Sequence, residues 1–90
     1  MRIYQIVGNT GEYEDASEWV AKSFTNEIKA KDYLHFLTNK LKDLKGEASW
    51  YNLYFDKEGE IIEKMKPFDN NFQLDYTGTY YSLQEFDVEE

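Results

Sequence analysis

The apolar stripe that begins at Ala30 is the strongest constraint on what this chain can fold into. Apolar side chains recur 3, 4, 7, 11, 14 and 18 residues after it, a spacing that puts them on one face of a helix with 3.6 residues per turn. Thr25 or Asn26 can cap the start of this helix, and Gly46 is a natural stop. We therefore predict one main amphipathic helix over residues 26–45. The stripe consists of Ala30, Tyr33, Leu34, Leu37, Leu41, Leu44 and Ala48.

Strand-forming residues lie on both sides of this helix. Residues 3–7 and 17–24 predict two paired strands joined by the loop 8–16, and residues 80–88 predict a final strand, because these runs are rich in β-branched and aromatic residues. Apolar residues on both faces of 3–7 are typical of a central strand.

Residues 50–65 allow two interpretations. The turn-like sequence Asp56-Lys57-Glu58-Gly59 separates two strand-compatible runs and favours a hairpin. The alternative is a helix that continues through Tyr54, and the sequence leaves it open. With the hairpin, the fold class is α+β, in the order β-β-α-β-β-β, with the helix packed on a small, largely antiparallel sheet. The length of 90 residues predicts a single domain over 1–90.

Composition excludes several classes of function. The chain has no cysteine, which removes disulfides, thiolate metal sites and cysteine nucleophiles. A net charge of −8 disfavours direct binding to nucleic acid. The sequence has no long apolar run, so we expect a cytoplasmic protein with no membrane association. Residues 1–45 are neutral overall, and the whole charge of −8 falls in residues 46–90.

We find no set of residues that points to catalysis or to metal binding. His35 lies off the apolar stripe and is expected on the surface, where no nucleophile accompanies it. The acids near Asp69 and near Asp56 do not follow the spacing of a calcium loop. The Gly8-Asn9-Thr10-Gly11 segment is interpreted as a turn, because acids follow it and would repel phosphate. The expectation is therefore a protein without enzymatic activity, cofactor or metal.

Aromatic residues are unusually abundant, with eight tyrosines, six phenylalanines and two tryptophans. A core of this size can use some of them, such as Trp19, but not all. Tyr80 and Tyr81 must point to opposite faces of their strand, so one of them should be exposed unless the sheet is covered on both sides. Exposed aromatic rings are frequent anchors of protein interfaces.

Two segments resemble a group of short proteins of bacteria and their phages that have no assigned activity. These are Ile6-Val7-Gly8-Asn9-Thr10-Gly11-Glu12-Tyr13-Glu14-Asp15 and Asp75-Tyr76-Thr77-Gly78-Thr79-Tyr80-Tyr81-Ser82-Leu83-Gln84-Glu85-Phe86. The group opens with strand–Gly-Glu-Tyr-Ser-Asp–strand–helix, and Glu14 stands here in place of its serine. The resemblance implies a similar order of elements and a bacterial or phage cytoplasm.

These observations lead to a hypothesis of a non-catalytic, acidic interaction module, monomeric or homodimeric. It would bind the basic surface of a protein, such as a host protein that handles nucleic acid. The candidate interaction residues are Tyr13, Trp19, Trp50, Glu58, Glu60, Asp69, Asp75, Tyr76, Tyr80, Tyr81, Glu85 and Asp87. The alternative is a domain that binds a small molecule or metabolite in a pocket lined by Tyr13, Trp19, Tyr76 and Tyr80.

Overall fold

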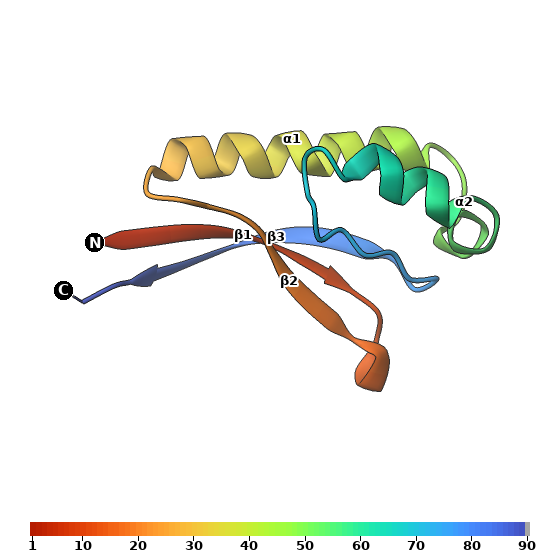
Figure 1. Ribbon diagram of the computed structural model, residues 1–90, viewed down its shortest axis with the longest axis horizontal. Coiled ribbons are helices and arrows are strands. Elements are labelled where there is room, and N and C mark those ends of the chain that lie inside the picture. Colours follow the sequence, from red (N-terminus) through yellow and green to blue (C-terminus); the bar gives the residue numbers. More distant parts are fainter. Residues whose placement is uncertain (90) are drawn as a thin grey trace.

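A three-stranded sheet with two helices forms the fold of this computed structural model, which describes residues 1–89 (Figure 1). The predicted α+β class is confirmed, but the order of elements is β-β-α-α-β. The elements are β1 (Arg2–Thr10), a short 3₁₀ helix η1 (Tyr13–Asp15), β2 (Ser17–Phe24), α1 (Glu27–Lys45), α2 (Trp50–Met65) and β3 (Thr79–Asp87).

The sheet has the order β2-β1-β3, and both strand pairs are antiparallel. The predicted pairing of the first two strands and the central position of β1 are confirmed. Gly8 on β1 is opposite Trp19 on β2 and Tyr81 on β3. The register between β1 and β2 shifts after Ile6, so that one residue of β2, Ala21, has no partner and forms a β-bulge.

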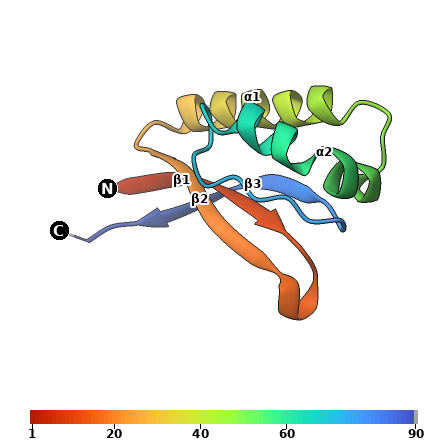
Figure 2. The same cartoon turned by 45° about the vertical axis from the view of Figure 1, so that its right-hand side comes forward.

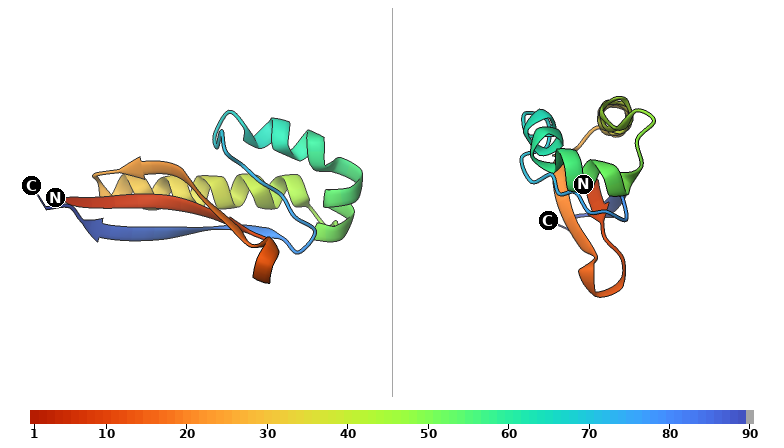
Figure 3. Two further views of the ribbon diagram at one scale, coloured as in Figure 1. Left: turned by 60° about the horizontal axis from the view of Figure 1, so that its bottom comes forward. Right: turned by 90° about the vertical axis from the view of Figure 1, so that its right-hand side faces the viewer.

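Both helices lie on the same side of this sheet, as the two views in Figure 3 show. The predicted helix is confirmed as α1, which packs on all three strands. Asn26 caps it by accepting a hydrogen bond from the backbone N–H of Lys29 at 2.9 Å, and Gly46 follows its last residue. Ala30, Leu37 and Leu41 of the predicted stripe are buried.

The predicted hairpin over residues 50–65 is wrong. The alternative, a helix that continues through Tyr54, is correct in its helical state, but α1 ends at Lys45 and residues 50–65 form a separate helix. Ser49 caps α2 by accepting from the backbone N–H of Asn52 at 3.1 Å. Lys57 has non-helical backbone angles (φ −137°, ψ 15°), so α2 consists of two helical segments joined at a kink (Figure 3). The turn-like sequence at residues 56–59 thus marks a change of direction within a helix rather than the tip of a hairpin.

Trp19 packs directly on the backbone of Gly8 at the centre of the core. A Cβ atom at position 8 would lie 2.2 Å from the indole ring, so only glycine leaves room for it. Phe72 and Tyr81 meet the same ring edge-to-face, with centroid distances of 6.2 and 6.5 Å. The core therefore depends on one close contact between a large ring and bare backbone.

The two ends of the described chain pair with each other. The backbone N–H of Val88 donates to the carbonyl of Met1 at 2.7 Å. Figure 2 shows both ends on one side of the molecule, opposite the turn between β1 and β2 and the turn that precedes β3. Neither helix in residues 1–89 combines the length and the apolarity required to span a bilayer.

Candidate functional site

Three of the residues predicted to contact a partner, Trp19, Asp69 and Tyr81, lie in the interior. Asp69 is only 1% exposed. Its Oδ2 atom accepts hydrogen bonds from Trp19 Nε1 at 2.8 Å and from the Tyr81 hydroxyl at 2.7 Å, and its Oδ1 atom accepts from the backbone N–H of Asn71 at 3.2 Å. These side chains cannot contact a partner in this conformation. We call Trp19, Asp69 and Tyr81 the interior cluster.

The interior cluster stabilises a buried carboxylate with neutral donors. Burial, together with the hydrogen bond to Asp69 and its charge, raises the pKa of Tyr81 far above its ordinary value. The phenol therefore stays protonated and remains a donor to Asp69 over the physiological range. The cluster has a structural role, because it holds the loop after α2 against the sheet.

Three further predicted acids form ion pairs within the chain. Glu85 and Asp87, near the ends of the described chain, lie 3.6 and 3.1 Å from the guanidinium of Arg2. On α2, Glu60 lies 2.8 Å from Lys64 one turn later, and hydrogen bonding to Lys64 lowers the pKa of Glu60. Glu58 lies on the same helix, after the kink. The structure does not bring these four acids together with Asp75.

The remaining predicted acid, Asp75, lines a surface hollow of about 490 Å³ together with Tyr13 and Tyr76. We call it the acidic hollow. Its seven lining residues, all within the described range, include four carboxylates and no lysine or arginine. They are Glu12, Tyr13, Glu14, Asp15, Asp75, Tyr76 and Thr77. None of the four ion pairs among residues 1–89 involves any of these acids.

Two short turns form the walls of the acidic hollow. In η1 the backbone N–H of Asp15 donates to the carbonyl of Glu12 at 3.1 Å. In the opposite wall, Asp75 Oδ2 accepts from the backbone and hydroxyl of Thr77 at 3.2 and 2.6 Å. The hydroxyl of Thr10, at the end of β1, donates to the carbonyl of Gly78 at 2.8 Å and so connects the two walls.

Tyr13 has the most unusual conformation in the hollow. Its φ angle is +53°, and it is the one described residue other than glycine with a positive φ. Its side chain is 94% exposed. A bulky residue in the left-handed region is strained, and no burial of the ring compensates for the strain.

A row of aromatic rings continues from the acidic hollow onto α2. Tyr76 contacts Tyr54, Tyr54 contacts Phe55, and Phe55 contacts Tyr51, with centroid distances of 6.3, 5.0 and 4.6 Å. Tyr51, Phe55 and Tyr76 are exposed, and Tyr54 is half-buried. We call Tyr51, Tyr54, Phe55 and Tyr76 the aromatic ridge. Because Tyr76 belongs to both, the hollow and the ridge form one continuous surface.

Trp50 and Tyr80, the two other predicted residues, lie outside this surface. Tyr80 is 64% exposed whereas its neighbour Tyr81 is buried, which confirms that the two point to opposite faces. Both Trp50 and Tyr80 line a separate cavity of about 220 Å³ between α1 and β3. The four residues predicted to form a small-molecule pocket (Tyr13, Trp19, Tyr76 and Tyr80) do not line a common cavity.

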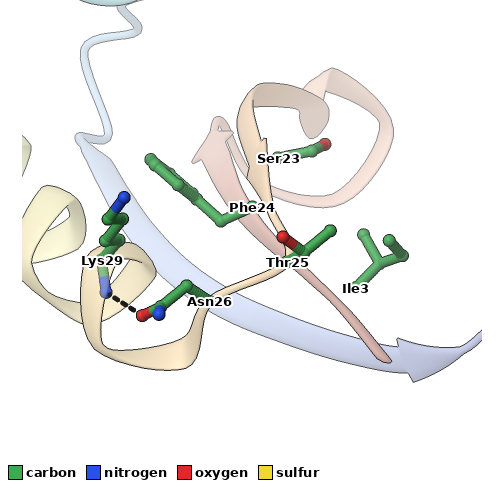
Figure 4. A pocket seen from close by; sticks show the side chains of 6 residues that line it. All are labelled: Ile3, Ser23, Phe24, Thr25, Asn26 and Lys29. Carbon is green, nitrogen blue, oxygen red and sulfur yellow. Dashed lines mark hydrogen bonds between the residues drawn. The ribbon is translucent and has the colours of Figure 1, made fainter. Parts of the chain in front are cut away.

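Another hollow, of about 380 Å³, lies at the connection between the end of β2 and the start of α1. Figure 4 shows its six lining residues, with the side chain of Asn26 turned back to the backbone of Lys29. The backbone N–H of Lys29 is thus already used by the cap. We see a structural role in this arrangement and no sign of a ligand.

Sequence reasoning missed most of the surface that the structure assembles, since it selected only three of the ten residues of the hollow and the ridge. Glu12, Glu14 and Asp15 lie in the half of the chain that is neutral overall, so the charge count gave no reason to select them. Tyr51 and Phe55 were assigned to a strand, which hid their common helical face. Within residues 1–89, no group of three acids or histidines is arranged to hold a metal ion.

The acidic hollow and the aromatic ridge can therefore offer charge and ring contacts, but they contain no nucleophile paired with a base. Comparisons of the chain with protein-family models, curated proteins and solved structures gave no match.

Proposed function

We propose that this chain is a non-catalytic interaction module that binds a protein with a basic surface through the acidic hollow and the aromatic ridge. One observation carries the proposal, namely the four carboxylates around an exposed tyrosine, with no lysine or arginine among the lining residues. Elsewhere in the chain, acids such as Glu60, Glu85 and Asp87 have a cationic neighbour. The hollow gathers four carboxylates, none of which takes part in the ion pairs found among residues 1–89.

The two parts of the surface supply different contributions to binding. Carboxylates attract a basic partner over a distance and select it by charge, whereas aromatic rings supply contact area once water is displaced. A lysine or arginine of the partner could stack on Tyr13 or Tyr76 while it pairs with Asp75 or Glu14, since cations bind favourably over aromatic faces. The strained, exposed Tyr13 fits this role, because its ring is held where a partner would meet it.

The partner class that fits best is a protein that handles nucleic acid, since the groove that holds phosphates in such proteins is basic. The resemblance to short proteins of bacteria and phages directs the search to a bacterial host protein, for which this chain would act as a competitor of nucleic acid.

Direct binding tests this proposal. Proteins captured from a bacterial lysate by the chain would be purified, and their affinity measured at about 0.05 and about 0.5 M salt. We expect a large loss of affinity at high salt, because screening removes most of the attraction between exposed charges. We also expect the chain to displace labelled duplex DNA from the partner.

A matched pair of variants assigns the binding to the hollow. Glu12→Gln, Glu14→Gln and Asp15→Asn together remove three charges from the hollow. Asp43→Asn, Glu47→Gln and Glu63→Gln remove three charges from exposed positions that do not line it. The first variant should lose binding and the second should keep most of it. Equal effects would show that only the net charge matters, and an affinity independent of salt would contradict the electrostatic part.

A further inference from the structure

The cavity between α1 and β3 has features of a small ligand site that is separate from the acidic hollow. Its lining comes from the second half of α1, the start of α2 and the first residues of β3, and its volume is about 220 Å³. A cavity of about 150 Å³ in another protein holds one benzene molecule. The space here is sufficient for one aromatic ring with a small substituent.

Rings and methyl groups form the walls of this cavity. Leu41 and Tyr81 are buried and supply its floor, while Trp50 forms one side. The indole of Trp50 packs on the backbone of Gly78, where a Cβ atom would lie 3.0 Å from its Nε1 atom. The indole therefore rests directly on the backbone, where glycine also adopts a φ of +114° that other residues rarely reach. A flat, apolar ligand would meet rigid surfaces.

The charges at this cavity have the opposite sign to those at the acidic hollow. Lys42 and Lys45 line it, and no acid does. Neither lysine takes part in the four ion pairs among residues 1–89. The ammonium group of Lys45 lies 5.4 Å from the centroid of the Trp50 ring, so a charge and an aromatic wall are adjacent. In a protein with a net charge of −8, a cavity whose charged lining is only cationic selects for an anion.

Few other polar groups compete for a ligand in this cavity. The Thr79 hydroxyl lies 2.8 Å from the Thr10 hydroxyl and donates to the carbonyl of Gln73 at 3.0 Å, so it is already occupied. Thr38, which is exposed, remains at the rim. The hydroxyl of the exposed Tyr80 is a further neutral group at this cavity, so the recognition of a negative charge falls to the two lysines.

We propose that this cavity binds a small aromatic carboxylate, with the ring against Trp50 and Leu41 and the carboxylate at Lys42 and Lys45. The same lysines also lie in the last turn of α1, where cations stabilise the helix end. The proposal does not depend on the function proposed for the acidic hollow.

The two tryptophans give the experiment an internal control. In a ¹⁵N-labelled sample, titration with benzoate should shift the indole N–H resonance of Trp50. The resonance of Trp19, whose N–H is bound to Asp69, should stay in place. Benzamide has the same ring without the charge and should bind about tenfold more weakly, because it cannot pair with the lysines.

Variants then locate the site. Lys42→Gln with Lys45→Gln should abolish the preference for benzoate over benzamide. The control, Lys57→Gln with Lys66→Gln, removes two charges from α2 and its end and should preserve that preference. Thr38→Phe should block both compounds by filling the entrance without altering either lysine. The proposal is overturned if benzoate leaves the Trp50 resonance unmoved, if benzamide binds equally well, or if the two control lysines matter as much as Lys42 and Lys45.

Discussion

Asp69 and Asp75 are six residues apart in the same loop, yet their environments are opposite. Asp69 is buried and accepts three hydrogen bonds from neutral donors. Asp75 accepts two hydrogen bonds from Thr77, two residues later, and lines a hollow with three other acids. The interior cluster thus uses a carboxylate to fix the loop, and the acidic hollow uses carboxylates to create a charged surface. The net charge of the chain does not distinguish a structural carboxylate from one that is available to a partner. The positions of the hydrogen-bond donors and of the lysines and arginines around each carboxylate do.

Removing Asp69 should have the largest effect on the molecule. Asp69→Ala leaves the Trp19 N–H and the Tyr81 hydroxyl buried without a partner, so we expect a loss of about 3 kcal/mol in the free energy of unfolding. Chemical denaturation followed by circular dichroism measures it. The matched variant Asp75→Ala removes two local, partly exposed hydrogen bonds with Thr77 and should lose about 1 kcal/mol or less, because water can replace them. Equal losses at both positions would remove the distinction between interior and surface.

Alkaline pH should weaken the interior cluster. Because the pKa of Tyr81 is raised by folding above its unfolded value of 10.0, its contribution to stability is fully present below pH 10 and is lost as the pH rises above that value. Tyr4 and Tyr33 also have raised pKa values, from burial first and a nearby carboxylate second.

The slope of unfolding free energy against pH, between about pH 9 and 11, tests this expectation. Tyr81→Phe should reduce the slope, although it also lowers stability at neutral pH. The control Tyr80→Phe changes an exposed ring on the next residue and should leave the slope as it is. A slope that Tyr81→Phe leaves unchanged would show that other tyrosines cause the alkaline loss.

The smallest effect should come from Tyr13, where we expect a gain in stability. Asparagine tolerates the left-handed region better than tyrosine, so Tyr13→Asn should raise the free energy of unfolding by about 1 kcal/mol. The same change should weaken binding of a basic partner at the acidic hollow. A loss of stability would mean that the ring makes a contact that its exposure conceals.

The fold was predictable where an apolar pattern repeats over several turns of a helix, and where two strands are joined by a short connection. The stripe from Ala30 to Leu44 predicted α1 nearly to the residue, and the runs around Ile6 and Trp19 predicted the first strand pair. The helix over 50–65 was not predictable from its pattern, because its kink at Lys57 interrupts the helical spacing. Two short helical segments then match the pattern of two short strands.

The surface was less predictable because it is assembled from distant segments. The charge count directed attention to residues 46–90, yet three of the four acids of the hollow (Glu12, Glu14 and Asp15) belong to the neutral half. Local composition cannot show that the β1–β2 turn meets the turn before β3. Burial of Asp69 was also hidden, since a carboxylate followed by two asparagines is typical of an exposed loop.

The hydrogen bond from Thr10 to the carbonyl of Gly78 has a consequence for how this surface could diversify. It holds the two turns together at the residues where they join the strands. Residues 12–15, at the tip of the first turn, do not belong to the core. Substitutions at the tips can therefore change which partner is recognised while the spacing between the two turns is preserved. Related chains that keep threonine and glycine at these positions would be expected to vary most freely at residues 12–15.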